Sequence, residues 1–259
     1  MLLSGQTIKK YFIDNQLIEN GNLDCIHSSS YDVTISNKIL RLAKNKKISL
    51  IDANAIESMY KEVSIDKGYY IKPGETILVV LKEKFNMPLN MTGMIRGRTS
   101  FNRLGLYVAT QHINPGYCGV LNIAITNNSS NSYMLMPNMN IAQVVFEELD
   151  IKVDEKSVDV TKYQNEDGKS GSKIYQDYIG KVVRHFKGNY YFIENVALDS
   201  ETQEYVVFYR ALYPRDDSQT WVRNASMFFE KIDSSRKDNI TKQTYRFEIA
   251  DDVRKDYTK

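Results

Sequence analysis

Short stretches of alternating apolar and polar residues, separated by turn residues, constrain the fold of this chain more than any other feature. Residues 31–35, 76–80 and 120–124 alternate with the period of two that is typical of half-buried strands. Turn-forming Pro, Gly and Asn residues stand between such stretches, for example at residues 72–74 and 137–138. Many short strands joined by loops favour an antiparallel barrel or a two-sheet jelly roll. We therefore predict a mainly β fold.

Changes of pattern along the chain predict two domains and a tail. A helical spacing of apolar residues over residues 6–18 predicts one short helix before the strands begin. The last strand of the first sheet is expected near residues 144–149, and the polar stretch 150–171 is interpreted as a surface tail or linker. The expected boundaries are a first domain at 1–177, a small all-β domain at 178–232, and a charged, frayed or disordered tail at 233–259.

Composition limits which binding partners and which cellular compartment we expect for this chain. The 259 residues carry 34 Lys and Arg against 32 Asp and Glu, and this net charge of +2 gives no footprint for a polyanion. We therefore do not expect the first domain to bind nucleic acid. Cys25 and Cys118 lack disulfide or metal-ligand spacing, so we interpret them as core residues in a reducing compartment. Without a leader-like start or a run of about 18 apolar residues, we expect a soluble cytoplasmic protein with no membrane contact.

The loop at residues 97–105 brings together the groups that a phosphate site needs. Its first residue is a glycine, which allows a phosphate to approach the backbone closely. Arg98 offers a guanidinium for two oxygens, and Thr99 and Ser100 add hydroxyls and backbone amides. Arg103 adds a second cation. By itself, the cluster is equally compatible with an ordinary exposed loop before a strand.

Several short motifs surround this loop in a definite order. They are Ser29–Val33, Tyr70–Thr76, Met87–Pro88, Gly97–Leu106, His112–Gly119, Pro137–Gln143 and Phe146–Glu147, followed by Lys162–Gly168 and Ser172–Tyr175. In order and spacing the series resembles the dCTP deaminases, including their C-terminal tail, within the dCTP deaminase and dUTPase superfamily. The resemblance covers residues 1–177.

This resemblance implies a dUTPase-like distorted β-barrel that binds a deoxypyrimidine nucleoside triphosphate, dCTP or dUTP. It also implies a homotrimer with pockets between subunits, and Mg²⁺ that arrives on the triphosphate rather than in a metal site of the protein. Arg98, Thr99, Ser100 and Arg103 match the phosphate and catalytic-loop positions of the family. Lys162 matches a tail lysine that reaches the phosphates.

For the sugar and the base, the resemblance implies Asn114, Tyr117, Asn122 and Glu166. Asn114 can keep a hydrogen bond to the 3′-hydroxyl. Tyr117 lies in the hairpin that excludes a 2′-hydroxyl in this superfamily, although an aromatic residue there is as readily core packing. We interpret Asp32 as supporting the fold or the subunit contact rather than the chemistry.

Two proton acceptors that the family chemistry needs are replaced. Deamination at C4 of cytosine requires a base that takes a proton from water and an acid that returns one to the leaving amine. In dCTP deaminases without zinc, one glutamate on the strand after the Asn-Pro-Gly-type turn serves both roles, and that position holds Ala124. Asn114 stands where an aspartate is usual, which in dUTPases activates the water. Glu166, in place of a tail glutamine, and Arg96, in place of an acidic residue, are further departures.

Three functions therefore stay open. The first is a dCTP deaminase-like hydrolase with a missing or relocated base. Glu166 or His112 could then accept the proton, although a solvated tail glutamate and a hydrogen-bonded strand-end histidine explain these residues as well. The second is a catalytically inactive nucleotide sensor, regulator or sequestering protein. The third is a pyrophosphatase acting on a modified deoxynucleotide. The motifs of zinc deaminases are absent from the sequence.

The C-terminal part carries its own motifs. Gly180–Gly188, Val207–Tyr213 and Thr220–Arg223 make residues 178–232 resemble a small bacterial domain of unknown function. No catalytic constellation is visible in it. Its residues could form a recognition surface for a base, a phosphate or a peptide, or could fill a small barrel core. The candidates for the surface are Tyr209, Arg210, Tyr213, Trp221 and Arg223, and we favour the core for Phe208, Trp221 and Phe228.

Overall fold

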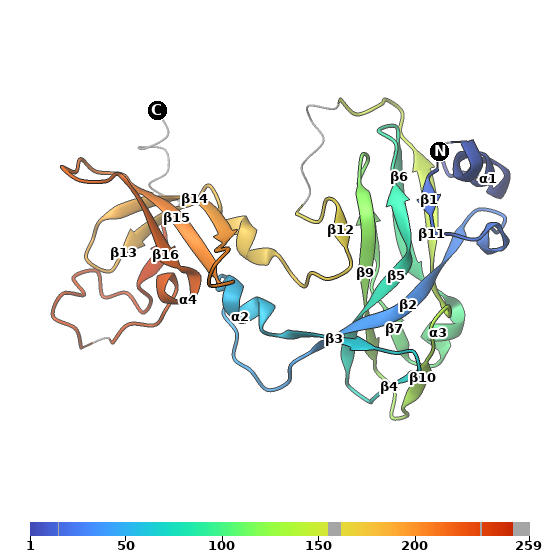
Figure 1. Cartoon of the computed structure of the whole chain (residues 1–259), viewed down its shortest axis with the longest axis horizontal. Coiled ribbons are helices and arrows are strands. Elements are labelled where there is room, and N and C mark those ends of the chain that lie inside the picture. Colours follow the sequence, from blue (N-terminus) through green and yellow to red (C-terminus); the bar gives the residue numbers. More distant parts are fainter. Residues whose placement is uncertain (15, 155–161, 234, 251–259) are drawn as a thin grey trace. The chain divides into compact units, whose positions relative to one another are not determined.

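The computed structural model describes residues 1–14, 16–154, 162–233 and 235–250. The chain divides into two compact units (Figure 1). Unit 1 consists of residues 1–44 and 60–171, and unit 2 consists of residues 45–59 together with the chain from Ser172 onward. Both units are built mainly from strands, as the alternating pattern predicts, and the mainly β fold is confirmed.

Unit 1 combines a short N-terminal helix with one large sheet. Its helices are α1 (Gly5–Asp14) and α3 (Thr99–Arg103), with a 3₁₀ turn at Leu23–Cys25. Its strands are β1 (Ile18–Glu19), β2 (Tyr31–Leu42), β3 (Tyr60–Ser64), β4 (Tyr69–Ile71), β5 (Thr76–Asn86), β6 (Met91–Gly97), β7 (Leu106–Val108), β8 (Gln111–Ile113), β9 (Cys118–Asn127), β10 (Tyr133–Leu135), β11 (Asn140–Glu148) and β12 (Glu166–Asp167). The helix expected over residues 6–18 ends earlier, at Asp14, and β11 ends where the last strand was predicted.

The large sheet of unit 1 has the strand order β12-β9-β5-β2-β11-β6-β8. Strands β1, β3 and β7 pair off this path with β5, β2 and β9, and β4 and β10 form a separate two-stranded sheet. Along β9, buried and half-buried residues alternate without interruption, so one face of the strand packs into the apolar core and the other is left for polar contacts. This alternation is what fixes the register of the strands that carry the candidate site.

The end of unit 1 folds back onto its own sheet. Strand β12 pairs in parallel with β9, with Glu166 opposite Gly119. Glu166 and Gly168 are buried, and Ser170 accepts a hydrogen bond from Asn122 on β9. The stretch 150–171 was expected to be a surface tail or linker, and for its last part this expectation is wrong because the segment supplies an edge strand to the sheet.

Unit 2 is a five-stranded sheet with two short helices. The elements are α2 (Ala53–Glu57), the 3₁₀ turn η3 (Ile174–Tyr178), β13 (Val182–His185), β14 (Tyr190–Leu198), β15 (Tyr205–Ala211), β16 (Thr220–Asn224), α4 (Ala225–Phe228) and β17 (Phe247–Ile249). The strand order is β16-β15-β14-β13-β17, and all of the pairings are antiparallel. The core contains Phe228 and Phe247, whose rings stack with centroids 4.0 Å apart, and Tyr209 packs edge-on to both.

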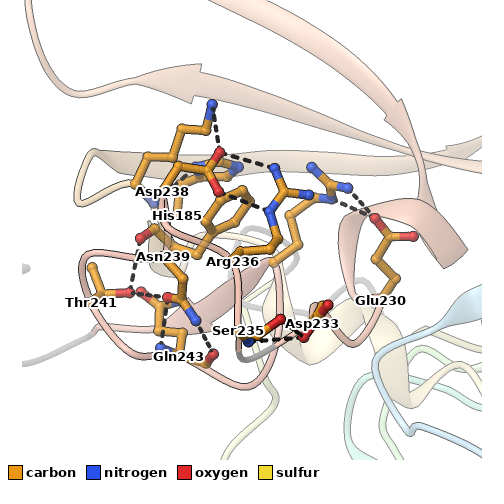
Figure 2. Close-up of polar contacts among 12 residues, drawn as sticks. His185, Glu230, Asp233, Ser235, Arg236, Asp238, Asn239, Thr241 and Gln243 are labelled. Atoms are coloured by element: carbon orange, nitrogen blue, oxygen red, sulfur yellow. Dashed lines mark hydrogen bonds and ion pairs between the residues drawn. The ribbon is translucent and has the colours of Figure 1, made fainter.

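The small domain is longer at both ends than its expected boundaries of 178 and 232. The unit begins at Ser172, and β17 adds a strand to β13 well beyond residue 232. In the charged segment between residue 232 and β17, the buried side chains of Asn239 and Gln243 form hydrogen bonds with backbone groups (Figure 2). These bonds give the segment an ordered conformation. Residues 235–250 therefore belong to the domain rather than to a tail. The expected tail residues 251–259 lie outside the described residues.

A segment from the middle of the first domain completes unit 2. Residues 45–59, which connect β2 to β3, carry α2, and its Ala53 and Ile56 are buried. The Asn54 side chain forms hydrogen bonds with both backbone groups of Tyr205, accepting from its N–H at 2.5 Å and donating to its carbonyl oxygen at 3.1 Å. Asp52 accepts hydrogen bonds from the backbone of Ala55 and from the Ser226 hydroxyl. No local sequence signal indicated this docking.

Candidate nucleotide site

Arg98 is held in place by a buried carboxylate. It precedes α3, and its Nη2 lies 3.2 Å from Oδ2 of Asp32, whose side chain is 2 % exposed. Its Nη1 donates a hydrogen bond of 3.0 Å to the carbonyl oxygen of Asn140. Asp32 is also 3.2 Å from Nε2 of His27. Because these contacts use only part of the guanidinium's five donors, Arg98 is oriented while part of its donor set stays available for a ligand.

The rest of the 97–105 loop presents polar groups to solvent. Phe101 is buried and anchors α3, while Thr99, Ser100 and Arg103 are exposed. Gly97 has little room for a side chain, since a Cβ atom would lie 3.3 Å from Cβ of Val108. The loop therefore offers two hydroxyls and a cation beside Arg98. This arrangement is chemically suited to phosphate oxygens.

Ala124 lies in the middle of a regular strand. It faces Leu78 of β5 in the register, and its carbonyl oxygen accepts a hydrogen bond from the Ala109 amide at 2.9 Å. Its side chain is half-buried on the same face of β9 as Asn122 and Thr126. A shift by one residue would turn the buried residues of β9 out of the core. The position between Asn122 and Thr126 on this polar face is therefore firmly alanine, and a methyl group cannot transfer a proton.

The returning segment places a carboxylate beside the other half of β9. Glu166 accepts a hydrogen bond from the Ser170 hydroxyl, and the Ser170 carbonyl oxygen accepts one of 2.9 Å from Asn122. Burial raises the pKa of the buried Tyr117, and the negative charge of Glu166 raises it further. Three of the four predicted sugar and base residues, Tyr117, Asn122 and Glu166, are thus gathered around the junction of β9 and β12.

Two buried acceptors near Asn122 have no donor within the described residues. They are Oδ1 of Asn122 itself and Oε1 of Gln111. Gln111 donates a hydrogen bond of 2.8 Å from Nε2 to the Asn122 carbonyl oxygen, so the two side chains belong to one cluster. Neither Gln111 nor Ser170 was predicted, because neither stands in a motif whose chemistry demands it. The Gln111 hydrogen bond to the Asn122 carbonyl oxygen and the return of the segment after β12 to β9 bring these residues together.

The remaining predicted residues lie elsewhere on unit 1. Asn114 is exposed in the turn that ends at Tyr117, where its carbonyl oxygen accepts the Tyr117 amide at 3.1 Å. His112 is exposed, with Nε2 3.0 Å from the Thr92 hydroxyl. Since neighbouring side chains on a strand point to opposite faces, His112 points away from the face of β8 on which Gln111 contacts Asn122. Lys162 lies in the turn before β12.

Comparison with known proteins gives this site a context. Residues 2–149 match the model of a family described as dCTP deaminase-like. The chain belongs to the dCTP deaminase-like family. Residues 181–249 match a second family, described as a protein of unknown function (DUF1653). The second match extends past residue 232, in agreement with the place of β17 in unit 2.

The chain is also similar to named relatives and to solved structures. The dCTP deaminase, dUMP-forming, of Sulfurihydrogenibium is 29% identical over 181 residues, which are 68% of this chain and 99% of that protein. The protein of the same name from Corynebacterium glutamicum is 28% identical over 70% of this chain and 100% of its own. The Agrobacterium tumefaciens 2′-deoxycytidine 5′-triphosphate deaminase structure covers 57% of this chain and 48% of its own, with 17% identity and a TM-score of 0.49. A DUF1653 structure from Bordetella bronchiseptica is 31% identical, with a TM-score of 0.25, over 29% of this chain and 90% of its own.

The described part of the dCTP deaminase-like chain contains neither a cluster of metal-binding side chains nor a helix that could span a membrane. Over the described ranges, no three His, Cys, Asp or Glu side chains are grouped so that they could hold a metal ion. The helices in the described part of the chain are too short or too polar to cross a membrane. Cys25 is buried, Cys118 is half-buried, and both are free thiols.

Proposed function

We propose that unit 1 binds a deoxypyrimidine nucleoside triphosphate, dCTP or dUTP, and that it deaminates this ligand very slowly or not at all. Family membership supports the ligand class. The orientation of Arg98 by Asp32 supports a prepared phosphate site, because an arginine that is already fixed loses less conformational entropy on binding. The nucleotide would carry its own Mg²⁺, so the protein needs no metal ligands of its own.

In this proposal each predicted residue has a separate task. Arg98 and Arg103, with the hydroxyls of Thr99 and Ser100, bind the phosphates. Lys162 adds a charge from the C-terminal segment. Asn114, exposed at its turn, forms a hydrogen bond with the 3′-hydroxyl. The buried Tyr117 ring shapes this turn from inside, so selection against a 2′-hydroxyl would come from the turn's backbone rather than from the ring face.

The single observation that carries the loss of deamination is Ala124. Water must lose a proton as it attacks C4, and the amine must gain one as it leaves. Acid-base groups for such steps contribute about 10²- to 10⁴-fold in rate. A regular strand presents a methyl group at the position where the family has a glutamate, and this is why we favour a nucleotide sensor, regulator or sequestering protein over an enzyme.

A paired assay tests the proposal. The purified full chain is incubated with Mg²⁺ and dCTP, dUTP or a ribonucleotide control, the products are resolved, and binding is measured in parallel by calorimetry. We expect saturable binding of the deoxynucleotides without product. Deamination or diphosphate release at rates normal for enzymes would overturn the inactive assignment, and absence of binding would overturn the ligand.

A second candidate function rests on Glu166. This carboxylate is 9 % exposed and is linked to Asn122 through Ser170, so it is a buried acid beside the polar face of β9. It could accept the proton of the attacking water if the nucleotide bound with its base against this part of β9. Under this alternative, any slow deamination would disappear in Glu166→Gln. The inactive binder predicts instead that the substitution changes only affinity.

We also propose that the chain forms a homotrimer with pockets between subunits. Exposed apolar residues on unit 1 support an interface, since surfaces that gather such residues mark contacts with other chains. Tyr70 on β4 and Met134 on β10 face each other in the register, and both are exposed. Met136 and Met139 are exposed in the segment that follows β10.

A further inference from the structure

Trp221 and Arg223 share the inner face of the unit 2 sheet. In the register, Trp221 lies opposite Tyr209 and Arg223 lies opposite Val207, and both partners on β15 are buried. Val222, between them, is exposed on the other face, as expected for a strand. A tryptophan and an arginine two residues apart are therefore directed toward the side of the sheet that holds the aromatic core.

Arg223 differs from the other arginines of unit 2 that the structure describes. Each of the others donates to a side-chain acceptor: Arg184 to Gln243, Arg210 to Glu194, Arg215 to Asp217, Arg236 to Asp238 and Arg246 to Glu230. The Arg223 side chain has no hydrogen bond or ion pair with any described residue, and its Nε is buried. Buried donors in native proteins nearly always have an acceptor. We therefore expect a ligand to supply the acceptor for Nε of Arg223.

The indole N–H of Trp221 is a second unsatisfied donor, after Nε of Arg223. Its Nε1 is buried and has no acceptor among the described residues. The ring itself is covered by Arg215, whose guanidinium carbon is 4.9 Å from the indole centroid. Arg215 is held by Asp217 and by the Tyr213 hydroxyl, to which Nη1 donates at 2.9 Å. The indole is thus covered on one side by a fixed cation while its N–H, like Nε of Arg223, lacks an oxygen.

Arg223 is one of several positive groups that act on His185. The pKa of His185 is lowered to about 4, first by burial and then by the positive charges of Arg246, Arg223 and Lys187, while Asp238 acts in the opposite direction. Arg246 is paired with Glu230, and Lys187 with Asp238 (Figure 2). The charge of Arg223 has no such partner in the part of the chain that the structure describes. His185 accepts the Lys187 amide at Nδ1, which leaves the proton of the neutral ring on Nε2 as another donor.

We propose that Arg223 and Trp221 form a binding site for a phosphate oxyanion, either inorganic phosphate or the phosphate of a nucleotide. A guanidinium can donate two parallel hydrogen bonds to such a group, and the indole N–H can donate a third. The oxygens of one phosphate group could accept hydrogen bonds from both the Arg223 guanidinium and the Trp221 indole. Arg210, which was grouped with these residues on sequence grounds, is excluded because it is paired with Glu194 and lies on the opposite face from Tyr209.

The sequence contains a single tryptophan, so Trp221 supplies its own probe. The full chain labelled with 5-fluorotryptophan gives one ¹⁹F resonance, which is followed at constant ionic strength during titration with inorganic phosphate, a nucleoside monophosphate, the nucleoside alone, or acetate. We expect a saturable shift with one or both phosphate compounds, and the more effective of the two identifies the source. Arg223→Gln should weaken this binding at least tenfold.

Matched variants separate the site from general charge effects. Arg210→Gln removes a paired arginine from the same unit and should leave the titration unchanged. Arg98→Gln in unit 1 should also leave it unchanged, which keeps this site distinct from the nucleotide site proposed above. Should Arg223→Gln fail to fold, Arg223→Lys retains the charge but loses the two-pronged donor, and we expect affinity to fall several-fold. No shift with phosphate, an equal shift with acetate or nucleoside alone, or a shift unchanged in both Arg223 variants would overturn the proposal.

Discussion

At the residue scale, Ala124 is the position whose chemistry decides the proposed function. The strand around it is regular, its neighbours Asn122 and Thr126 on the same face are polar, and its own side chain is half-buried. A carboxylate at this position would therefore not enter the apolar core. Function can change here without a change of fold, because the β9 register depends on the residues of the opposite face.

Ala124→Glu is expected to create or raise dCTP deamination by about 100-fold or more, the low end of what a positioned acid-base group contributes. The readout is dUTP or ammonia formed by the purified chain with Mg²⁺. Ala124→Gln is the control. Its side chain has the size of glutamate but cannot act as an acid or a base, so this variant should remain inactive. If the glutamate variant binds dCTP and is still inactive, then Asn114 or another departure also blocks the chemistry.

His185 makes the stability of unit 2 depend on pH. Its pKa is lowered from the ordinary 6.5 to about 4, first by burial and then by nearby positive charges. The unfolded chain binds this proton at pH values where the folded chain does not, so the stability from neutral His185 is present above pH 6.5 and is lost as pH falls toward 4. We expect a loss of about 1–2 kcal/mol after solvent screening of this half-buried group.

Urea unfolding at pH 7, 6, 5 and 4.5 measures this effect. In His185→Gln the slope between pH 6.5 and 4.5 should become shallower, because the variant has no proton to bind there. An equal slope in the variant would assign the pH dependence to carboxylates instead.

The candidate site was predictable to the extent that it consists of one continuous loop. The groups of the 97–105 loop are adjacent in the sequence, and their chemistry is legible from residue type alone. Asp32 could be interpreted as a supporting residue, but its contact with Arg98 joins strand β2 to the start of α3, two segments that lie far apart in the chain. The cluster of Gln111, Asn122 and Ser170 had no local signal because three separate segments contribute to it.

At the element scale, the connection between β2 and β3 was missed. Residues 45–59 have no strong periodicity, and their stability comes from packing α2 and its buried Ala53 and Ile56 within unit 2. Strand β17 was missed for a similar reason, since a three-residue strand after a charged segment is ordered by its pairing with β13. Short elements of this kind are specified by their neighbours rather than by their own sequence.

Asn54→Ala is expected to destabilise unit 2 by about 1–3 kcal/mol, because both backbone groups of Tyr205 lose a partner in a partly buried place. Thermal and urea unfolding measure the change, and limited proteolysis should show earlier cleavage within residues 45–59. Lys47→Ala, at an exposed position of the same segment, is the control and should change stability by less than about 0.5 kcal/mol. Equal stability of the two variants would contradict the assigned role of Asn54.

At the scale of the whole molecule, the exposed apolar residues of unit 1 suit an interface with another chain. Tyr70, Met134, Met136 and Met139 lie on β4, on β10 and in the segment after β10, where a second chain could bury them. Such a contact would also fit a family-type pocket completed by a neighbouring subunit, which is part of the proposed function.

Three copies of the 29.9 kDa chain predict an assembly of about 90 kDa in sedimentation equilibrium. Met134→Lys, which places a charge among the exposed apolar residues, should shift the population toward monomer without unfolding the chain, as checked by circular dichroism. Arg96→Ala is the control, because it changes an exposed residue without altering the exposed apolar residues, and it should leave the assembly unchanged. A monomer in the unmodified chain at micromolar concentration would refute the trimer.

The sequence alone determined the mainly β class, the dCTP deaminase-like family that residues 2–149 match, the polar groups of the 97–105 loop and the alanine at position 124. These follow from residue type, local period and motif order, which do not require long-range contacts. The tertiary structure alone decided that residues 45–59 belong with unit 2, that β12 and β17 join their sheets, that Asp32 holds Arg98, and that the Arg223 side chain lacks a partner among the described residues. Each of these depends on pairing between distant segments, and the free energy of such pairing comes from burial and hydrogen bonds that no single stretch of sequence contains.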